Sequence, residues 1–226
     1  MSKQKTCAVL TAHIDNLERM NLNINGYDTL ICTDAGLLTA NILDRIPDIL
    51  IGDYDSLKVA ELNHHTKFHS THMIDELSGK AEIITLPVMK DVTDTEAALD
   101  LAVERGYSSI DIIGGLGGRL DHTLGNLALL SKYAGTNSDI IIADGQNKVF
   151  MLTAGRHFVK HERYTFMSLV PYGGFVHGLK LKGTKYLLDN HTLIGKNTLG
   201  ISNEIIAEHA EISFEKGQLL VVLSSD

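Results

Sequence analysis

Residues 110–126 read IDIIGGLGGRLDHTLGN, and this stretch decides how the first part of the chain folds. Residues 110–113 form a short, β-branched run typical of a buried strand, and glycines follow at positions 114, 115, 117 and 118. Glycine lets backbone N–H groups approach a phosphate closely, and the guanidinium of Arg119 binds phosphate oxygens through a fork of hydrogen bonds. The stretch therefore predicts a strand followed by an anion-binding loop.

The residues after this loop predict a helix over residues 122–133. Asp121 is of a type that caps helix N-termini, and His122 and Asn126 are spaced by four, which places them on one helical face. The alternative is a flexible turn before an ordinary capped helix, which would leave Arg119 and His122 without a role. We therefore expect the loop and the helix start to form part of a ligand site.

The first 146 residues alternate strand and helix patterns throughout. Strands are expected at residues 8–10, 30–32, 49–51, 83–84, 110–113 and 140–142, and helices at 15–22, 37–43, 96–105 and 122–133. Such alternation predicts a Rossmann-like α/β domain with a mostly parallel sheet and helices on both faces. Sheets of this kind bind ligands beyond the carboxyl ends of their strands.

The pattern changes at about Asn147, where strand-like runs separated by glycines replace the alternation. These runs lie at residues 149–152, 164–170, 179–181, 211–214 and 219–223, with no convincing long helix among them. We expect an all-β sandwich domain at residues 147–226. The turn at 144–147 would end the first domain, residues 1–146.

A pair of aspartates, Asp53 and Asp55, follows the strand expected at residues 49–51. Two carboxylates one residue apart in an extended turn can reach the same hard cation, and Mg²⁺ held by carboxylates and phosphate oxygens is usual in nucleotide sites. The alternative is that Asp55 or Ser56 only caps the next helix. Capping explains one aspartate and not both, so the pattern favours a metal site.

A further polar cluster, residues 90–96, opens the helix expected at 96–105. Thr93 and Glu96 have the spacing of a capping box, and acids in a first turn suit the helix dipole. Capping does not explain Lys90, which would form an anion pocket with the free N–H groups of the helix start, with Asp94 beside it as a metal ligand. Taken alone, the cluster leaves a helix cap and a ligand site equally open.

Composition limits the classes of partner and the compartment. The chain has 226 residues and a formal net charge of −8, so nothing predicts a basic surface for nucleic acid or anionic lipid. No apolar run approaches the roughly 20 residues of a membrane span, and none forms a signal peptide. Cys7 and Cys32 lie in apolar strand-like runs and are expected to be buried and unpaired. We expect a cytoplasmic protein.

The three polar clusters together resemble the signature blocks of thiamine pyrophosphokinases. Gly-Asp-Tyr-Asp-Ser at 52–56, Lys-Asp-x-Thr-Asp-x-Glu at 90–96, and Gly-Gly-Arg-x-Asp-His at 117–122 followed by Asn126 occur in the order of that family and at roughly its spacing. The resemblance extends to Asp34, after the second expected strand, and to Ser202 and Asn203 near the C-terminus. It covers nearly the whole chain.

The resemblance implies a thiamine diphosphokinase, an enzyme that transfers the pyrophosphoryl group of ATP to the hydroxyl of thiamine and releases AMP. It implies that residues 1–146 bind ATP with Mg²⁺ and that residues 147–226 bind thiamine. It also implies a homodimer in which thiamine lies between the α/β domain of one subunit and the β domain of the other. By motif match the metal ligands are Asp53, Asp55 and Asp94, which are also the catalytic groups together with Arg119. The ATP side comprises Asp34, Lys90, Thr93, Glu96, Arg119, Asp121, His122 and Asn126, and Ser202 and Asn203 face thiamine.

Three other functions fit some of these residues. A kinase for another small alcohol would share the ATP side. A phosphatase of the haloacid dehalogenase type would present an aspartate such as Asp53 as a nucleophile, but Gly52 before it and the Arg119 block argue against this class. A non-catalytic sensor of thiamine or nucleotide would be expected to have lost Lys90 or the carboxylates, and all are present.

Two features remain open at this stage. Residues 60–75 contain His64, His65, His69 and His72, whose spacing offers imidazoles to zinc, although a solvated loop is expected because no cysteine or helical pattern accompanies them. The chain has no tryptophan, so an aromatic contact to thiamine is not specified.

Overall fold

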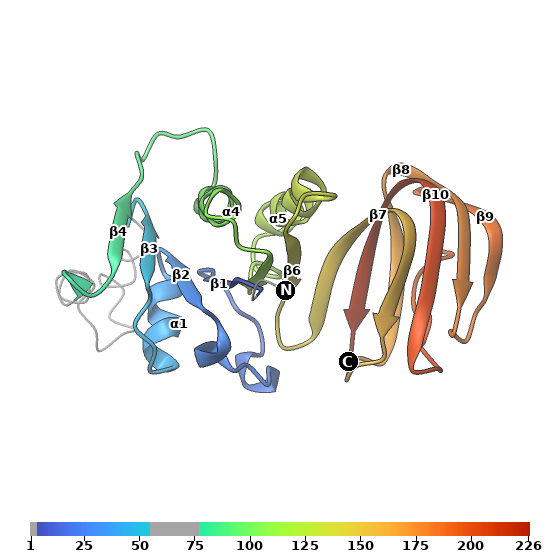
Figure 1. Ribbon diagram of the computed structural model, residues 1–226, viewed down its shortest axis with the longest axis horizontal. Helices are drawn as coiled ribbons and strands as arrows, with labels where there is room; N and C mark the ends of the chain where they lie inside the picture. Colours follow the sequence, from blue (N-terminus) through green and yellow to red (C-terminus); the bar gives the residue numbers. More distant parts are fainter. Residues whose placement is uncertain (1–3, 55–76) are drawn as a thin grey trace.

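The computed structural model of the protein describes residues 4–54 and 77–226. The strands of these residues form one ten-stranded sheet in the order β4-β3-β2-β1-β5-β6-β7-β10-β8-β9 (Figure 1). The sheet runs through the long axis of the molecule, from a part with helices at one end to a part built of strands at the other. The two parts of the chain therefore share one continuous sheet.

The N-terminal strands are parallel and spread outward from β1. After β1 (Thr6–Leu10) the chain adds β2 (Thr29–Thr33), β3 (Ile49–Gly52) and β4 (Glu82–Thr85) on one side, then β5 (Ser109–Ile113) and β6 (Asp139–Ala143) on the other. All neighbouring pairs among these six strands are parallel. The strand order reverses between β1 and β5, and open α/β sheets bind ligands at such a switch point.

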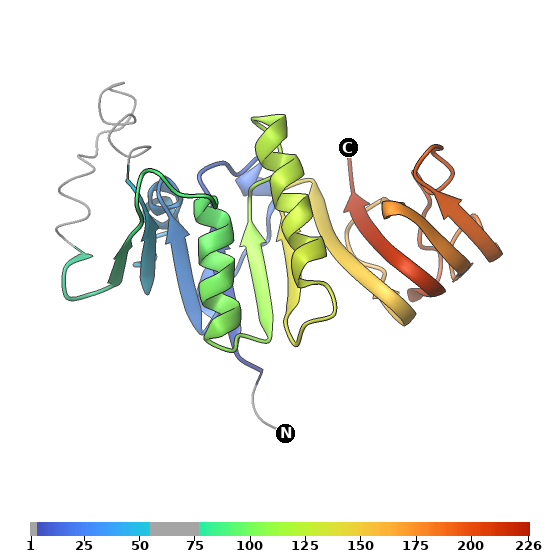
Figure 2. The ribbon, with the colours of Figure 1, turned by 90° about the horizontal axis from the view of Figure 1, so that it is seen from above.

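Helices cover both faces of the parallel part because its strands are apolar on both sides. On β1, Cys7 and Val9 join the apolar cluster that contains α4 (Asp94–Glu104) and α5 (Leu120–Tyr133). Ala8 and Leu10 point the other way and join the cluster that contains α1 (Gly36–Ile42). Figure 2 shows α4 and α5 side by side along one face of the sheet.

The helix expected at residues 15–22 is not formed, and this prediction is wrong. The segment contains the 3-10 turn Leu17–Arg19, and a second one follows at Ile24–Gly26. Asn16 has a left-handed backbone, with φ of 51°, at the point where a helix would have to begin. Within the described residues, no helix has the length and apolar character needed to span a membrane.

Four antiparallel strands complete the sheet: β7 (Asn147–Lys160), β8 (Phe166–Lys182), β9 (Leu188–Ile194) and β10 (His209–Ser224). They are longer than expected, because β8 and β10 each join two of the predicted runs, and β9 was not predicted. The register of β10 against β7 shifts between Phe214 and Gln218, around Gly217, whose φ is 109°. A Cβ at Gly217 would lie 2.4 Å from the carbonyl oxygen of Phe175. Glycine therefore marks an irregularity inside the strand here and not its end.

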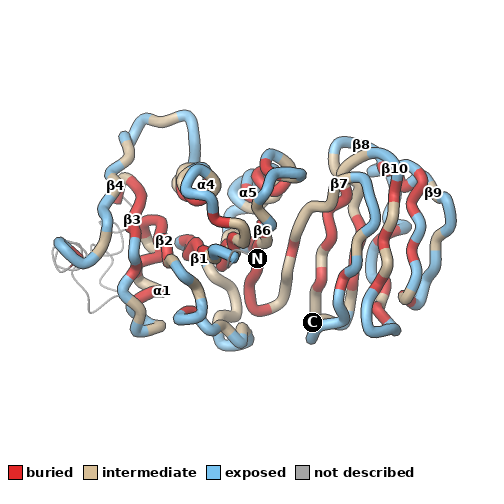
Figure 3. Tube along the Cα trace, viewed as in Figure 1, coloured by how far each residue is buried: buried red, intermediate tan, exposed pale blue. Residues whose placement is uncertain are grey.

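Residues on both sides of this irregularity enter one apolar core. On β10, Ile212 and Phe214 precede Gly217, Leu219 and Val221 follow it, and all four belong to the same buried cluster. Burying a side chain such as Leu219 fully contributes about 1.5–3 kcal/mol. Figure 3 shows the buried positions recurring along the strands, while the outward sides of α4 and α5 are exposed. The C-terminal part thus has a core of its own beside the two clusters of the parallel part.

Candidate active site

A cavity of about 460 Å³ opens at the carboxyl edge of the parallel strands. It is bounded by the ends of β1, β2 and β5 and by the starts of α4 and α5, so it lies at the switch point of the sheet. Of the predicted site residues, Asp34, Lys90, Thr93, Asp94, Arg119, His122 and Asn126 line it. A larger cavity, of about 720 Å³, lies between the end of α5, β6 and β7 and contains none of the predicted site residues.

Three carboxylates converge beside the cavity. Asp34 follows β2, Asp53 follows β3 and Asp94 begins α4, and one oxygen of each lies within 4.8 Å of those of the other two. The structure thus brings together two predicted metal ligands, Asp53 and Asp94. It adds Asp34, which the sequence placed on the ATP side. Asp55, the third predicted ligand, lies outside the described residues.

Lys90 neutralises part of this cluster. Its Nζ lies 3.1 Å from Asp53 Oδ2 and 2.8 Å from Asp94 Oδ1, and the exposed fraction of its side chain is 14%. Burial alone would lower the pKa of Lys90, but the close contacts of its ammonium group with the Asp94 and Asp53 carboxylates outweigh burial, and the pKa is raised. Lys90 is therefore held as a cation against two carboxylates.

Gly52 fixes the position of Asp34. A Cβ at Gly52 would lie 2.0 Å from Asp34 Oδ1, so any other residue would push the carboxylate away. The same Oδ1 accepts a hydrogen bond from the backbone N–H of Tyr54 at 3.0 Å. Tyr54 has a left-handed φ of 63°, and its hydroxyl donates to the carbonyl of Ile84 at 3.0 Å. The turn after β3 is thus shaped around the Asp34 carboxylate.

The donor set suits a hard divalent cation. Asp94 Oδ1 is buried and accepts no hydrogen bond from the described residues, because its contact with Lys90 has the distance of an ion pair without hydrogen-bond geometry. Carboxylate oxygens are the ligands that Mg²⁺ takes beside phosphate. Asp34, Asp53 and Asp94 are therefore the described residues that could hold Mg²⁺.

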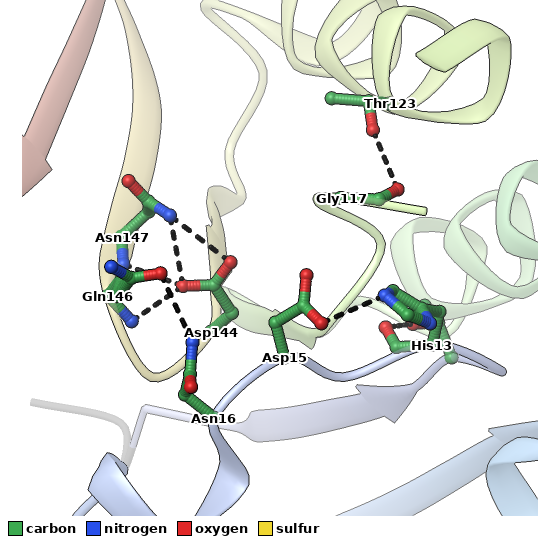
Figure 4. A network of polar contacts seen from close by, with 9 residues as sticks. His13, Asp15, Asn16, Gly117, Thr123, Asp144, Gln146 and Asn147 are labelled. Atoms are coloured by element: carbon green, nitrogen blue, oxygen red, sulfur yellow. Dashed lines mark hydrogen bonds and ion pairs between the residues drawn. The ribbon is translucent and has the colours of Figure 1, made fainter. Parts of the chain in front are cut away.

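The glycine-rich loop forms the opposite wall of the cavity. All four of its glycines have positive φ, from 61° at Gly118 to 90° at Gly114. Asn126 is buried and donates from Nδ2 to the carbonyl of Gly115 at 2.7 Å. The hydroxyl of Thr123 donates to the carbonyl of Gly117 at 3.1 Å, as Figure 4 shows. The first turn of α5 therefore holds the loop in shape. Asn126 acts here through the loop backbone.

Arg119 and Asp121 lie at the exposed mouth of the cavity. The prediction that Asp121 caps the helix is wrong, because α5 begins at Leu120 and Arg119 occupies the N-cap position without a side-chain hydrogen bond. Asp121 instead pairs with Arg119 at 2.6 Å. The hydrogen bond from Arg119 lowers the pKa of Asp121 to about 2. Asp121 is not among the residues that line the cavity.

The start of α4 combines a helix cap with the site. Thr93 is the N-cap, and its hydroxyl oxygen accepts from the N–H of Glu96 at 3.2 Å. The Glu96 carboxylate pairs with Lys132 of α5 at 2.9 Å and lies outside the cavity lining. The capping interpretation thus holds for Thr93, while Lys90 and Asp94 belong to the carboxylate cluster.

The sequence missed the residues that follow β1. Thr11 and His13 line the cavity, and His13 pairs with Asp15 at 3.0 Å (Figure 4). Thr33, at the end of β2, lines it as well. Their position in the sequence could have indicated them. Thr11 and Thr33 directly follow the expected strands 8–10 and 30–32, and ligands bind at the carboxyl ends of such strands.

Ser202 and Asn203 lie in the other half of the molecule. They belong to the connection between β9 and β10, where Asn203 forms an isolated bridge with Met167 of β8, three strands beyond β6 in the sheet. The buried Asn203 side chain accepts from the N–H of Tyr186 at 3.0 Å and donates to the carbonyl of the same residue at 2.8 Å. Ser202 is exposed, with φ of 57°. One chain does not bring these residues to the cavity.

The fold and the cavity define a class of protein. A parallel sheet with a switch point, a carboxylate cluster that suits Mg²⁺, a lysine and a glycine-rich loop at a helix start are the parts of an enzyme that handles phosphate groups.

Comparison with known proteins narrows this class to a family. Residues 20–142 match the family model "Thiamin pyrophosphokinase, catalytic domain", and residues 156–219 match "Thiamin pyrophosphokinase, vitamin B1 binding domain". The chain is 36% identical over 198 residues to the thiamine pyrophosphokinase of Bacillus subtilis, which covers 87% of each chain. The chain belongs to the thiamin pyrophosphokinase family, and its function is that of a thiamine pyrophosphokinase.

Solved structures agree with this assignment. The crystal structure of the Bacillus subtilis thiamine pyrophosphokinase superposes with a TM-score of 0.83 at 31% identity, covering 98% of this chain and all of that one (100%). The thiamin pyrophosphokinase of Candida albicans has a TM-score of 0.74 at 14% identity, covering 98% of this chain and 90% of that one, and shows that the fold is shared.

Proposed function

We propose that the chain transfers the pyrophosphoryl group of Mg²⁺-bound ATP to the hydroxyl of thiamine, with the cavity at the carboxyl edge of β1, β2 and β5 as the nucleotide site. The observation that carries this proposal is the convergence of Asp34, Asp53 and Asp94 within 4.8 Å, beside Lys90 and opposite the glycine-rich loop. This arrangement supplies both a cation site and anion-binding groups, which a polyphosphate needs together.

The metal site is assigned to the carboxylate cluster. Asp53 and Asp94, with Asp55 by motif match, are the proposed ligands, and Asp34 joins them on the geometry described above. Mg²⁺ held there would bind phosphate oxygens and reduce the charge that develops on them. The placement of Asp34 by Gly52 and Tyr54 keeps the cluster in shape before any ligand binds.

The phosphate chain is assigned to the other cavity residues. Lys90 and Arg119 supply positive charge, and the glycine-rich loop and the start of α4 supply backbone N–H groups. To bind the phosphate, Arg119 must release its ion pair with Asp121, and its exposed side chain is free to move in this way. Thr93, His122 and Asn126 line the cavity, and Asn126 also donates to the carbonyl of Gly115. Glu96 and Asp121 lie outside the lining and pair with Lys132 and Arg119.

The reaction follows from this placement. The thiamine hydroxyl oxygen forms a bond to the β-phosphorus of ATP while the bond from that phosphorus to the bridging α-phosphate oxygen breaks, and AMP leaves. Phosphoryl-type transfer depends mainly on alignment and on stabilising the departing charge, which Arg119 and Lys90 provide. We assign the hydroxyl proton to a carboxylate of the cluster, late in the step.

Thiamine binding is assigned to the C-terminal domain near Ser202 and Asn203. The Asn203 side chain binds both the backbone N–H and the carbonyl of Tyr186, and Tyr186 is 60% exposed. Thiamine carries a positively charged ring, and an exposed tyrosine face attracts such cations. Tyr186 is therefore the proposed aromatic contact to thiamine in this chain, which has no tryptophan.

A homodimer with shared sites is proposed because the nucleotide and thiamine residues lie far apart along the sheet of one chain. Exposed apolar side chains surround both: Val88, Met89, Leu120 and Leu124 near the cavity, and Leu187, Leu199, Ile201 and Ile206 near Asn203. In a twofold dimer, the apolar surface near the cavity of one subunit would pack against the surface near Asn203 of the other, and symmetry would repeat this contact once. Each of the two sites would then contain residues from both subunits.

The domain assignment is also a proposal. We assign residues 1–146 to a Rossmann-like ATP-binding catalytic domain and residues 147–226 to a thiamine-binding sandwich domain. A cytoplasmic location remains the expectation from the sequence.

The activity is tested by incubating the protein with thiamine, ATP and Mg²⁺ and following the products by phosphorus NMR and chromatography. Thiamine diphosphate with an equal amount of AMP is expected, and Asp94→Asn should abolish both. Thiamine monophosphate with ADP would indicate an ordinary kinase, and phosphate release without thiamine would indicate a phosphatase.

The shared site is tested by mixing two inactive variants, Asp94→Asn and Tyr186→Ala, after dissociation and reassociation. If each site combines both subunits, the mixed dimer contains one intact site, and activity returns. If each chain forms its own site, the mixture stays inactive, and the dimer proposal fails.

A further inference from the structure

The loop after β1, residues 11–16, lies at the switch point of the sheet and has no assigned role. It follows the strand whose neighbours are β2 on one side and β5 on the other, so it reaches the middle of the carboxyl edge. His13 from this loop lines the same cavity as Lys90 and Arg119.

The backbone of His13 is fixed from two sides. Its carbonyl accepts from the N–H of Gly115 at 2.9 Å and from the hydroxyl of Thr11 at 3.2 Å. A Cβ at Gly114 would lie 2.2 Å from the same carbonyl, so the glycine-rich loop and the β1 loop are in direct contact. The further end of the β1 loop is tied down by the N–H of Gly145, which donates to the carbonyl of Asp15 at 2.9 Å.

The side chain of His13 is oriented by Asp15 and rests on the glycine-rich loop. Its Nε2 lies 3.0 Å from Asp15 Oδ1 (Figure 4). A Cβ at Gly117 would lie 2.1 Å from Asp15 Oδ2, and one at Gly118 would lie 3.4 Å from the His13 ring. The imidazole is nevertheless 53% exposed, so a ligand in the cavity can reach it.

We propose that His13, oriented by Asp15, is a further contact for the phosphate chain of ATP, an inference that rests on the proposed function. With Asp15 accepting from Nε2, the other ring nitrogen, Nδ1, is available, and it donates to a phosphate oxygen when both nitrogens carry protons. The titratable groups nearby are Asp15 of the same loop and the groups that share the cavity: Asp34 after β2, Lys90 and Asp94 at the start of α4, and Arg119 and His122 at the start of α5.

Phosphate is favoured over the base as the contacted group. The ring lies against Gly117 and Gly118, whose backbone forms the anion-binding turn, and shares the cavity with Lys90 and Arg119. A hydrogen-bond donor at this position complements the negative charge of a polyphosphate.

The experiment compares His13→Ala and His13→Asn with the wild type. The measured quantities are KM for ATP, KM for thiamine, kcat, and the inhibition constant of tripolyphosphate with Mg²⁺ as a competitor of ATP. Asparagine keeps an N–H donor close to the position of Nδ1. His177→Ala is the matched control, because His177 is also 53% exposed and also faces a carboxylate, Glu215 at 3.8 Å, on the C-terminal strands.

We expect His13→Ala to raise KM for ATP and the inhibition constant of tripolyphosphate by about tenfold each, the loss of one charge-assisted hydrogen bond at a half-exposed site. KM for thiamine should stay unchanged, His13→Asn should recover part of the loss, and His177→Ala should behave as wild type. An unchanged KM for ATP would overturn the inference. So would a raised KM with an unchanged tripolyphosphate constant, because the contact would then be to adenosine. A wild type that makes no thiamine diphosphate would instead refute the proposed function itself.

Discussion

Replacing Lys90 with methionine tests the electrostatic balance of the carboxylate cluster. Methionine keeps most of the length and apolar surface of the lysine stem and removes the charge. Asp34, Asp53 and Asp94 lie within 4.8 Å of one another, so each pair of charged carboxylates repels by roughly 3.5 kcal/mol or more at an effective dielectric constant of about 20. Lys90, 3.1 Å from Asp53 and 2.8 Å from Asp94, offsets this repulsion.

Proton uptake and local relaxation will relieve part of the repulsion in the variant. We therefore expect Lys90→Met to lower the free energy of unfolding by about 3 kcal/mol without Mg²⁺, the lower end of the range for removing one partner of a mostly buried ion pair. Mg²⁺ stabilises a protein that binds it only when folded, and it should bind Lys90→Met more tightly than the wild type because no ammonium group competes for the carboxylates. The loss of stability should therefore shrink as Mg²⁺ is added, because the cation replaces the missing charge.

The assay is urea unfolding followed by circular dichroism, with EDTA and with increasing Mg²⁺. Lys132→Met is the control, because Lys132 also pairs with two carboxylates, Glu96 and Asp100, but is 43% exposed. Its replacement should cost less than about 1 kcal/mol and should not depend on Mg²⁺. The reasoning is refuted if Lys90→Met is as stable as wild type in EDTA, or if its loss is the same at every Mg²⁺ concentration.

Three further changes test other parts of the site and the sheet. Gly52→Ala should displace the Asp34 carboxylate, since its Cβ would lie 2.0 Å from Oδ1. We expect the Mg²⁺ concentration needed for half-maximal activity to rise at least tenfold and the free energy of unfolding to fall by about 1–3 kcal/mol. An unchanged Mg²⁺ titration would contradict this. Asn126→Ala leaves the carbonyl of Gly115 without its donor and should cost about 1–3 kcal/mol in urea unfolding while raising KM for ATP, whereas a normal KM would separate Asn126 from the loop. Burial raises the pKa of Asp111 despite the hydrogen bond from Tyr27, so the folded state binds this proton more tightly and loses stability as pH rises past the ordinary value of an aspartate. Asp111→Asn should therefore stabilise the protein at pH 7 and not at pH 3, and an equal effect at both pH values would count against the burial argument.

The parallel part of the fold was largely predictable because each of its strands is a short apolar run bounded by polar or glycine-rich turns. The chain order of strands and helices then predicted parallel pairing. The segment at 15–22 misled because its apolar residues have helical spacing, while the left-handed backbone of Asn16 and the contacts of this loop with residues 145–146 decide its shape. Tertiary contacts of this kind leave no periodic signal.

The C-terminal strands show the opposite error. Glycines such as Gly173, Gly174 and Gly217 predict strand ends, whereas β8 and β10 continue through them. A local pattern does not distinguish a glycine that ends a strand from one inside it, because both lower strand propensity. β9 was missed because Leu188–Ile194 contains several polar residues and is largely exposed.

The sequence predicted that several polar residues gather at one edge of the sheet, but it did not predict how they group there. Asp53, Lys90 and Asp94 follow or precede elements in a way that placed them at one edge. The sequence did not reveal that Asp34 belongs with them, or that Glu96 and Asp121 turn toward Lys132 and Arg119. Both facts depend on the distance between neighbouring strand ends and on side-chain direction, which spacing along the chain does not encode.

The unbroken sheet sets the distance between the proposed nucleotide site and the proposed thiamine residues of each chain. Backbone hydrogen bonds join β6 to β7 at Ile141–Ala143, and β7 in turn pairs with β10 along most of its length. Each strand between the two ends adds about 4.8 Å to the distance between them. If the proposed dimer forms sites shared between its two chains, the width of this sheet determines how far apart the two sites lie. Adding or removing a strand between β6 and β8 would then put both sites out of alignment at once.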